Sequence, residues 1–195
     1  MSKRRIVIAE DEPLARLDLQ QMLENLGHEV VGEAGDGQVA IDLARELTPD
    51  LVIMDIKMPE MTGVEAAQIL AEEKIAPVLL LTAFSDKEFI DGARDAGVMA
   101  YIVKPYGENQ LAPAIDIALA RFAEFSELHK ELGDIKEALL TRKIVERAKG
   151  VLMDTANLKE SEAFHRIQRL SMNSRKSMRE VAEAILLTHG IETPS

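Results

Sequence analysis

The chain has 195 residues, 47% of them hydrophobic, and contains no cysteine. This length suits one domain of ordinary size and a second, small one, and the missing cysteine excludes disulfide frameworks, thiolate metal sites and cysteine nucleophiles. The net charge of −11 is uneven, because residues 1–140 carry 13 basic and 27 acidic side chains whereas residues 141–195 carry 10 and 7. An acidic N-terminal part and a slightly basic C-terminal part indicate two domains with different functions.

The apolar run nearest the N-terminus, residues 6–9, is followed directly by Glu10 and Asp11. It is too short for the apolar region of a secretory signal peptide, and no later stretch approaches the roughly 18 apolar residues of a membrane span. We therefore expect a cytoplasmic protein without a membrane partner.

Short apolar runs alternate with helical patterns along the first hundred residues. The runs predict strands at residues 6–9, 29–32, 51–54, 78–81 and 99–103. Apolar spacings of three and four, or capping-box spacings, predict helices at residues 13–26, 38–47, 62–73 and 85–97, with a further helical pattern from Glu108. Five strands alternating with five helices indicate an α/β fold with a doubly wound, five-stranded parallel sheet.

Residues 108–140 show no strand signal. Apolar residues recur there at spacings of three and four, at Leu111, Ile115, Leu119, Phe122, Phe125, Leu128, Leu132, Ile135 and Leu139. This spacing predicts one long amphipathic helix or a short coiled coil, with Gly133 as a candidate interruption. We expect Leu111 and Ile115 to be shared between packing on the α/β domain and self-association.

The remaining residues predict a small domain of three helices. Apolar faces mark the first two helices, and Ser177 and Glu180 have the spacing of a capping box before the third. The expected organisation is an α/β domain over residues 4–125, a helical or coiled-coil linker over 126–140 and a three-helix domain over 141–190.

Polar side chains follow four of the predicted strands: Glu10 and Asp11, Asp55, Thr82 and Lys104. Because the carboxyl ends of parallel strands meet at one edge of a sheet, we expect these side chains to converge. Clustered carboxylates favour a hard cation such as Mg²⁺, and one carboxylate can act as a nucleophile that forms an aspartyl phosphate. A lysine supplies a compact charge for a phosphate oxygen.

Residues 4–125 resemble the receiver domain of two-component response regulators, which has a flavodoxin-like fold. The matching motifs occupy residues 8–13, 53–63, 81–83 and 100–105. The resemblance implies that Asp55 accepts phosphate from a histidine kinase. It also implies that Glu10, Asp11 and Asp55 hold Mg²⁺ together with the backbone carbonyl of Lys57.

The same resemblance assigns further roles. Thr82 and Tyr101 occupy the switch positions, Lys104 pairs with the phosphate, and the Lys104–Pro105 peptide bond is expected to be cis. The family usually has Asp-Asp where this chain has Glu10 and Asp11, which is a mild departure. The implied chemistry concerns only the phosphorylation and dephosphorylation of the chain itself, so we do not expect a free-standing enzyme.

Residues 141–190 resemble the ANTAR output domain, a family that binds RNA stem-loops in leader transcripts and prevents terminator formation. The matching runs are residues 144–153, 162–172 and 181–185, with Ser171 where the family often has alanine. Residues 166–179 contain five basic side chains and no acidic one. The candidate RNA contacts are Lys149, Arg166, Arg169, Arg175, Lys176 and Arg179, while Phe164 is expected in the core.

Three alternatives stay open. A DNA-binding response regulator would need a recognition helix rich in basic and amide side chains, in which the third helix is poor after Arg179. A phosphatase of the haloacid dehalogenase kind would have a second aspartate where Lys57 stands. A phosphorylation-dependent adaptor would bind protein only. In the preferred interpretation, Thr82 moves toward the phosphate, Tyr101 fills the space, and the chain forms a phosphorylation-dependent homodimer through residues 115–139.

Overall fold

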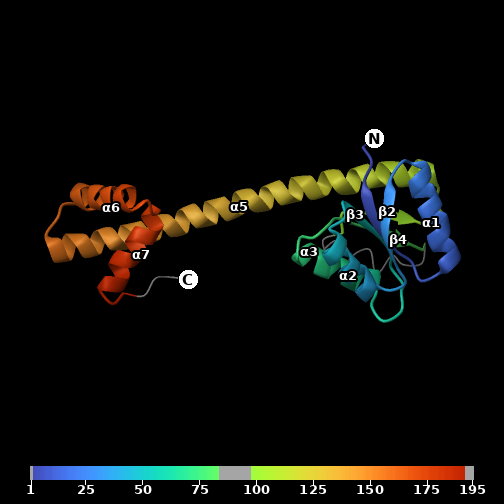
Figure 1. Cartoon of the computed structure of the whole chain (residues 1–195), viewed down its shortest axis with the longest axis horizontal. Coiled ribbons are helices and arrows are strands. Elements are labelled where there is room, and N and C mark those ends of the chain that lie inside the picture. Colours follow the sequence, from blue (N-terminus) through green and yellow to red (C-terminus); the bar gives the residue numbers. More distant parts are fainter. Residues whose placement is uncertain (1, 84–97, 192–195) are drawn as a thin grey trace. The chain divides into compact units, whose positions relative to one another are not determined.

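The computed structural model describes residues 2–83 and 98–191, so the helix predicted at 85–97 lies outside the described residues. The chain divides into two compact units, Met1–Ser126 and Glu127–Ser195. The long helix α5 (Glu108–Ala156) contributes residues to both units, as Figure 1 shows. Each unit is described by itself below.

The first unit contains the predicted parallel sheet. Its strands are β1 (Arg5–Ala9), β2 (Glu29–Ala34), β3 (Leu51–Asp55), β4 (Val78–Thr82) and β5 (Ala100–Val103). They lie in the order β2-β1-β3-β4-β5, and every neighbouring pair is parallel. The order reverses between β1 and β3, and in folds of this kind ligands bind at the carboxyl ends of the strands at such a point. The predicted fold class is thereby confirmed.

Helices cover both faces of this sheet. One core cluster joins the sheet to α2 (Gly37–Leu47) and α3 (Gly63–Glu72), and the other joins it to α1 (Pro13–Asn25) and the start of α5. Successive residues of β1 alternate between the two clusters, Val7 in the first and Ile6 and Ile8 in the second. Burial on both sides explains why the strands read as nearly continuous apolar runs.

The start of α5 belongs to the core of the first unit. Leu111, Ile115 and Ala118 are 0%, 1% and 0% exposed and pack in the cluster that contains α1. The expectation that Leu111 and Ile115 are shared with a self-association surface is therefore wrong, because their side chains are already covered. The helix also continues through Gly133, since glycine weakens a helix by only about 1 kcal/mol relative to alanine.

The described residues of the second unit, 127–191, form three helical segments, with the end of α5 in place of a separate first helix. The other two are α6 (Glu160–Ser174) and α7 (Met178–Thr188). The Ser177–Glu180 capping box that begins α7 is present as predicted. The core consists of the buried side chains Ile144, Val145, Ala148, Leu152, Ala163, Ile167, Val181, Ala182 and Leu186.

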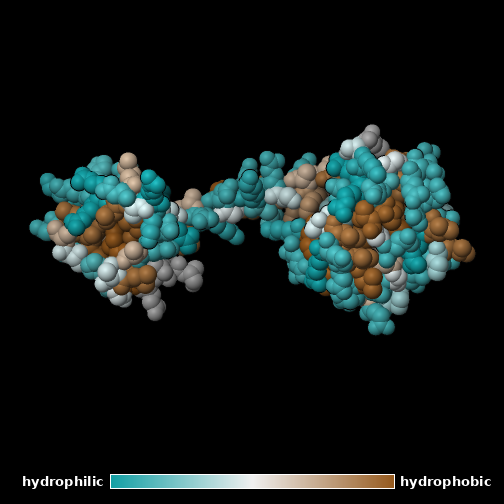
Figure 2. Space-filling model, in the orientation of Figure 1, coloured by the Kyte–Doolittle hydropathy of each residue, from teal (hydrophilic) through white to brown (hydrophobic). Residues whose placement is uncertain are grey.

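Figure 2 shows apolar side chains that reach the visible surface of each unit among mostly hydrophilic ones. Within residues 2–83 and 98–191, no helix is both long enough and apolar enough to cross a membrane.

Candidate functional site

The carboxyl ends of β1, β3 and β5 bring three charged side chains into contact. Lys104 Nζ lies 2.7 Å from Glu10 Oε2 and 2.9 Å from Asp55 Oδ1. The peptide bond between Lys104 and Pro105 is cis, and the Lys104 amide donates a hydrogen bond of 2.7 Å to the carbonyl oxygen of Thr82. One ammonium group thus bridges carboxylates from two neighbouring strands.

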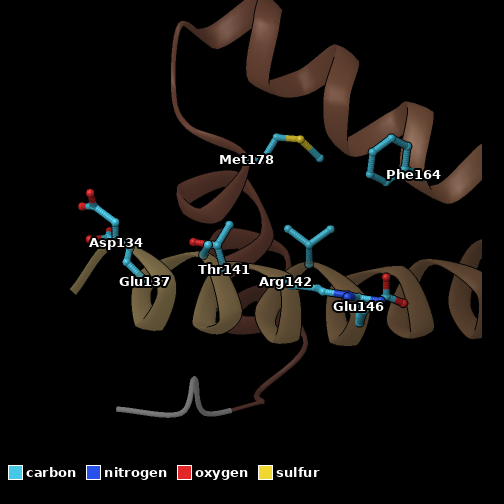
Figure 3. A pocket seen from close by; sticks show the side chains of 9 residues that line it. Asp134, Glu137, Thr141, Arg142, Glu146, Phe164 and Met178 are labelled. Atoms are coloured by element: carbon cyan, nitrogen blue, oxygen red, sulfur yellow. The ribbon is translucent and has the colours of Figure 1, made fainter. Parts of the chain in front are cut away.

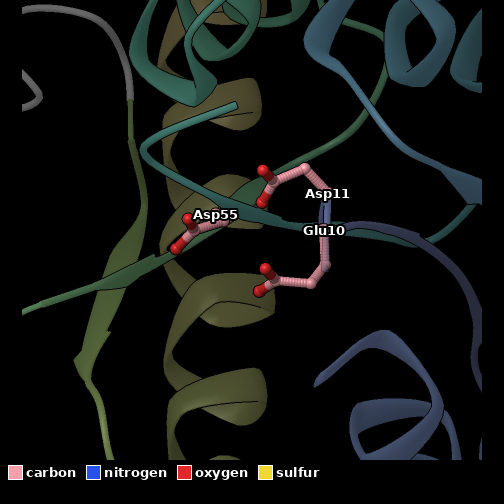
Figure 4. Close-up of side chains that lie close together, drawn as sticks. All are labelled: Glu10, Asp11 and Asp55. Carbon is pink, nitrogen blue, oxygen red and sulfur yellow. The ribbon is translucent and has the colours of Figure 1, made fainter. Parts of the chain in front are cut away.

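Asp11 completes a cluster of three carboxylates. Glu10, Asp11 and Asp55 each offer an oxygen, and these oxygens all lie within 4.8 Å of one another. In Figure 4 the three side chains, two from the end of β1 and one from the end of β3, point toward a common space. Glu10 is buried whereas Asp11 is exposed, so the cluster is open to water on one side. Hard oxygen ligands with room for water suit a cation such as Mg²⁺.

Burial and ion pairing act in opposite directions on these groups. Burial raises the pKa of the Glu10 carboxyl above its usual range, and the hydrogen bond from Lys104 offsets only part of that rise. Burial alone would lower the pKa of Lys104, but its hydrogen bonds to Glu10 and Asp55 and the negative charges of these two groups together outweigh burial and raise that pKa. Lys104 therefore stays cationic at neutral pH, with its charge directed at the carboxylates.

The two switch candidates lie in different environments. Thr82 is 0% exposed, and its hydroxyl donates a hydrogen bond of 3.0 Å to the carbonyl oxygen of Ala83. Tyr101 is 52% exposed on β5, where it pairs with Leu80 in the sheet. The side chain of Lys57 is exposed in the loop after β3.

Comparisons with known proteins identify the family. A response regulator receiver domain matches residues 6–116, and an ANTAR domain matches residues 133–186. The transcriptional regulatory protein PdtaR of Mycobacterium tuberculosis is 51% identical over 187 residues, which cover 96% of this chain and 91% of that protein. The chain belongs to the response regulators with an ANTAR output domain.

Receiver-sized proteins resemble the first unit of this response regulator. Chemotaxis protein CheY of Thermotoga maritima is 33% identical over 114 residues, which cover 58% of this chain and 95% of that protein. The signal receiver domain of a modulated diguanylate cyclase from Desulfovibrio desulfuricans G20 superposes with a TM-score of 0.58 at 30% identity. That match covers 63% of this chain and 98% of the solved one.

Lys149 of the ANTAR domain is a structural cation. It is 6% exposed, and its Nζ lies 2.7 Å from Glu160 Oε1 and 2.9 Å from Glu146 Oε2. Hydrogen bonds to Glu160 and Glu146 raise its pKa. The ion pairs connect α5 to the first turn of α6, so Lys149, unlike four of the cations described next, is not exposed.

The other predicted RNA contacts fall into two groups. Arg179 is paired, with Nε 2.8 Å from Glu183 Oε1 and Nη1 3.4 Å from Glu137 Oε1. The other four are exposed on α6 and the turn that follows it: Arg166, Arg169, Arg175 and Lys176.

The expectation that Phe164 lies in the core is wrong. Its side chain is 38% exposed and lines a cavity of about 680 Å³. Figure 3 shows Phe164 and Met178 facing the α5 segment that carries Arg142 and Glu146. Carboxylates of Asp134, Glu137 and Glu146 surround this cavity.

Arg16 supports the carboxylate cluster, although sequence reasoning did not single it out. Its Nη1 donates hydrogen bonds of 2.7 Å to the carbonyl oxygen of Glu10 and 3.2 Å to that of Ala34. These bonds hold the backbone at the ends of β1 and β2. No local pattern marks this arginine, because its acceptors are main-chain atoms of two other elements.

Gly63, the last residue of the motif at residues 53–63, is a second supporting residue. A Cβ atom at this position would lie 2.0 Å from the carbonyl oxygen of Asp55, and the Gly63 amide donates a hydrogen bond of 2.9 Å to the carbonyl oxygen of Ile56. The loop after β3 therefore folds back so that Gly63 lies against the backbone of Asp55. The capping box of Thr62 and Glu65 begins α3 at this point.

We predict that Gly63→Ala damages the receiver domain. The clashing atom belongs to the backbone, so no rotamer change relieves the contact, and we expect the free energy of unfolding to fall by roughly 1–3 kcal/mol. Urea denaturation measures this loss. Gly107→Ala is the matched control, because nothing lies within 4 Å of a Cβ there and only the weaker N-cap preference of alanine at the start of α5 remains, so its effect should stay below about 1 kcal/mol. Equal stability of the two variants would contradict the prediction.

Proposed function

We propose that a histidine kinase phosphorylates Asp55 and that the phosphate controls binding of the ANTAR domain to RNA stem-loops, and through it transcription antitermination. The observation that carries the proposal is the contact of Lys104 with Asp55 beside two further carboxylates, in a chain whose second domain matches ANTAR. Receiver and output domains in one chain couple a chemical signal to a binding surface.

Mg²⁺ is the proposed cofactor. Oxygens of Glu10, Asp11 and Asp55 lie close enough together to hold one cation, and the backbone carbonyl of Lys57 is the proposed fourth protein ligand. When bound, the cation offsets the repulsion between the carboxylates and an incoming phosphoryl group.

The chain's own side chains supply the rest of the chemistry. A carboxylate oxygen of Asp55 attacks the phosphorus of a phosphohistidine, an O–P bond forms, and the P–N bond breaks so that the imidazole nitrogen leaves with the electron pair. Lys104, already 2.9 Å from Asp55, pairs with a phosphoryl oxygen. Water later attacks the phosphorus, releases inorganic phosphate and restores the carboxylate. We propose no activity on other substrates.

The first test concerns Asp55. With a small phosphodonor and Mg²⁺, the protein should gain one acid-stable, base-labile phosphate, measured by intact-protein mass spectrometry. Asp55→Asn should abolish the gain because the amide is not a nucleophile, and chelation of Mg²⁺ should also prevent it. Asp50→Asn, a carboxylate at the opposite end of β3, is the control and should be phosphorylated normally. Undiminished label in Asp55→Asn would refute the assignment.

RNA binding is proposed for the exposed cations of the output domain. Arg166, Arg169, Arg175 and Lys176 have no acidic neighbour in the sequence between Arg166 and Arg179, and all four are exposed. Phosphate contacts supply most of the affinity of such surfaces and make it depend on salt. Helical modules recognise RNA through these contacts together with unstacked loop bases.

The second test reverses this charge. Arg166→Glu/Arg169→Glu should weaken binding to hairpin RNA at least about tenfold and lower the slope of log affinity against log salt by about one for each phosphate that is no longer bound. Phosphorylation of Asp55 should be unchanged. Lys3→Glu/Lys74→Glu, which makes the same change of net charge in the receiver, is the control. Tight RNA binding by the first variant would reject this surface. If the parent protein bound duplex DNA more strongly than RNA, a DNA-binding regulator would be favoured. If it bound no nucleic acid, a protein adaptor would be favoured.

Self-association through α5 is the proposed link between the two domains. Leu128, Leu132, Ile135 and Leu139 are 60%, 53%, 64% and 53% exposed and follow heptad spacing, so they form a stripe that suits a second copy of the same helix. In a parallel pair, Glu131 would face Lys136 of the second copy, which adds charge complementarity. Phosphate acts by favouring one arrangement of Thr82 and Tyr101 that in turn favours the dimer.

The third test measures this dimer. Sedimentation of the phosphorylated protein should show a larger mass than the unphosphorylated form, and RNA affinity should rise with mass because two linked sites act together. Leu132→Glu/Ile135→Glu should raise the dimer dissociation constant tenfold or more, since each buried side chain contributes roughly 1.5–3 kcal/mol. Leu187→Glu, at an exposed leucine outside the stripe, is the control. Equal mass and RNA affinity with and without phosphate would reject the coupling.

A further inference from the structure

A groove of about 540 Å³ runs along the exposed face of α6. Its lining includes Leu158, His165, Arg166, Arg169, Leu170 and Asn173. On α6 these residues recur at spacings of three and four, which places them on one side of the helix. The volume lies within the roughly 300–1,000 Å³ of small-ligand sites.

The groove combines three kinds of chemistry. Leu158 and Leu170 supply apolar surface, Arg166 and Arg169 supply positive charge, and the Asn173 side chain offers both a hydrogen-bond donor and an acceptor. Apolar surface beside cations suits a flat aromatic ring that is attached to a phosphate backbone. Unpaired bases in RNA loops are such rings, and proteins stack them on aromatic side chains and on guanidinium planes.

His165 is held in a defined orientation within this groove. Its ring lies 6.1 Å from the ring of Phe164 at an interplanar angle of 64°, and its Nδ1 lies 3.4 Å from Gln168 Oε1. These contacts leave the imidazole beside Arg166 and Arg169 in the lining of the groove. An oriented imidazole is one of the side chains on which bases stack.

One carboxylate, that of Glu162, also lines the groove. It accepts a hydrogen bond of 2.8 Å from the Lys159 amide, so its charge lies at the N-terminal end of α6, where the helix dipole stabilises it. The larger cavity beside Phe164 differs, because three carboxylates and one arginine, Arg142, line it, and this excess of negative charge would repel a phosphate. Of these two sites, the α6 groove is therefore the one whose charge suits nucleic acid.

We propose that this groove binds one unpaired base of an RNA loop. The base stacks on His165 against Leu158 and Leu170, Asn173 reads its hydrogen-bonding edge, and Arg166 and Arg169 bind the flanking phosphates. The inference rests on the proposed RNA-binding function and adds to it the place where sequence is read, because phosphate contacts by themselves carry no sequence information.

The experiment uses the full-length phosphorylated protein and hairpin RNAs with a fixed stem and a randomised loop. Sequencing of the bound pool identifies an enriched loop, and each nucleotide of that loop is then replaced in turn by an abasic one. At one position the abasic RNA should bind about tenfold more weakly, which is the effect expected for loss of one stacked base.

Variants of the groove should then show non-additive effects with that RNA. His165→Ala, Leu170→Ala and Asn173→Ala should each weaken binding to the intact hairpin and cause no further loss on the abasic hairpin, because the partner is already absent. The salt dependence should stay unchanged, since Arg166 and Arg169 are retained. Met172→Ala, at a residue that is 74% exposed and outside the groove lining, is the control and should bind like the parent.

Two outcomes would overturn the inference: groove variants that weaken the intact and the abasic hairpins equally, or an Asn173→Ala variant that selects the same loop with the same preference as the parent. Neither outcome touches the proposed function, which fails separately if charge reversal at Arg166 and Arg169 leaves RNA binding intact. Far-ultraviolet circular dichroism of each variant verifies that α6 is retained. Asn173→Asp keeps the hydrogen-bond acceptor and removes the donor, so it should change the preferred base.

Discussion

The ammonium group of Lys104 between Glu10 and Asp55 is the interaction on which the receiver site depends. Two carboxylates from neighbouring strands repel one another, and burial of Glu10 adds a desolvation cost that appears as a raised pKa. Lys104 offsets both effects while its own pKa is raised. In the proposed reaction, the same cation is then in place to meet the oxygens of a phosphoryl group on Asp55.

The parallel sheet makes this contact possible. β3 lies between β1 and β4, and β5 pairs with β4, so side chains separated by up to 94 positions in sequence approach within hydrogen-bonding distance. Backbone contacts then hold the strand ends in place, through Arg16 on the carbonyl oxygens of Glu10 and Ala34 and through the close approach of Gly63 to Asp55.

In the output domain, ion pairing with two carboxylates also distinguishes a buried cation from the exposed ones. Lys149 is buried between Glu146 and Glu160, whereas Arg166 and Arg169 line an open groove. All three are basic residues within the motifs that resemble ANTAR, so residue type by itself does not distinguish them. Their surroundings differ because Lys149 lies where α6 begins against α5, and the arginines lie on the outer side of α6.

The sequence by itself determined the α/β fold, the order of elements along the chain and the strand ends that carry Glu10, Asp11, Asp55, Thr82 and Lys104, because hydrophobic periodicity and parallel topology follow local rules. Only the tertiary structure decided that Leu111 and Ile115 are core residues, that Lys149 is paired and that Phe164 is partly exposed. Burial and pairing depend on which elements pack together, and that packing brings in atoms from distant parts of the chain that no local pattern contains.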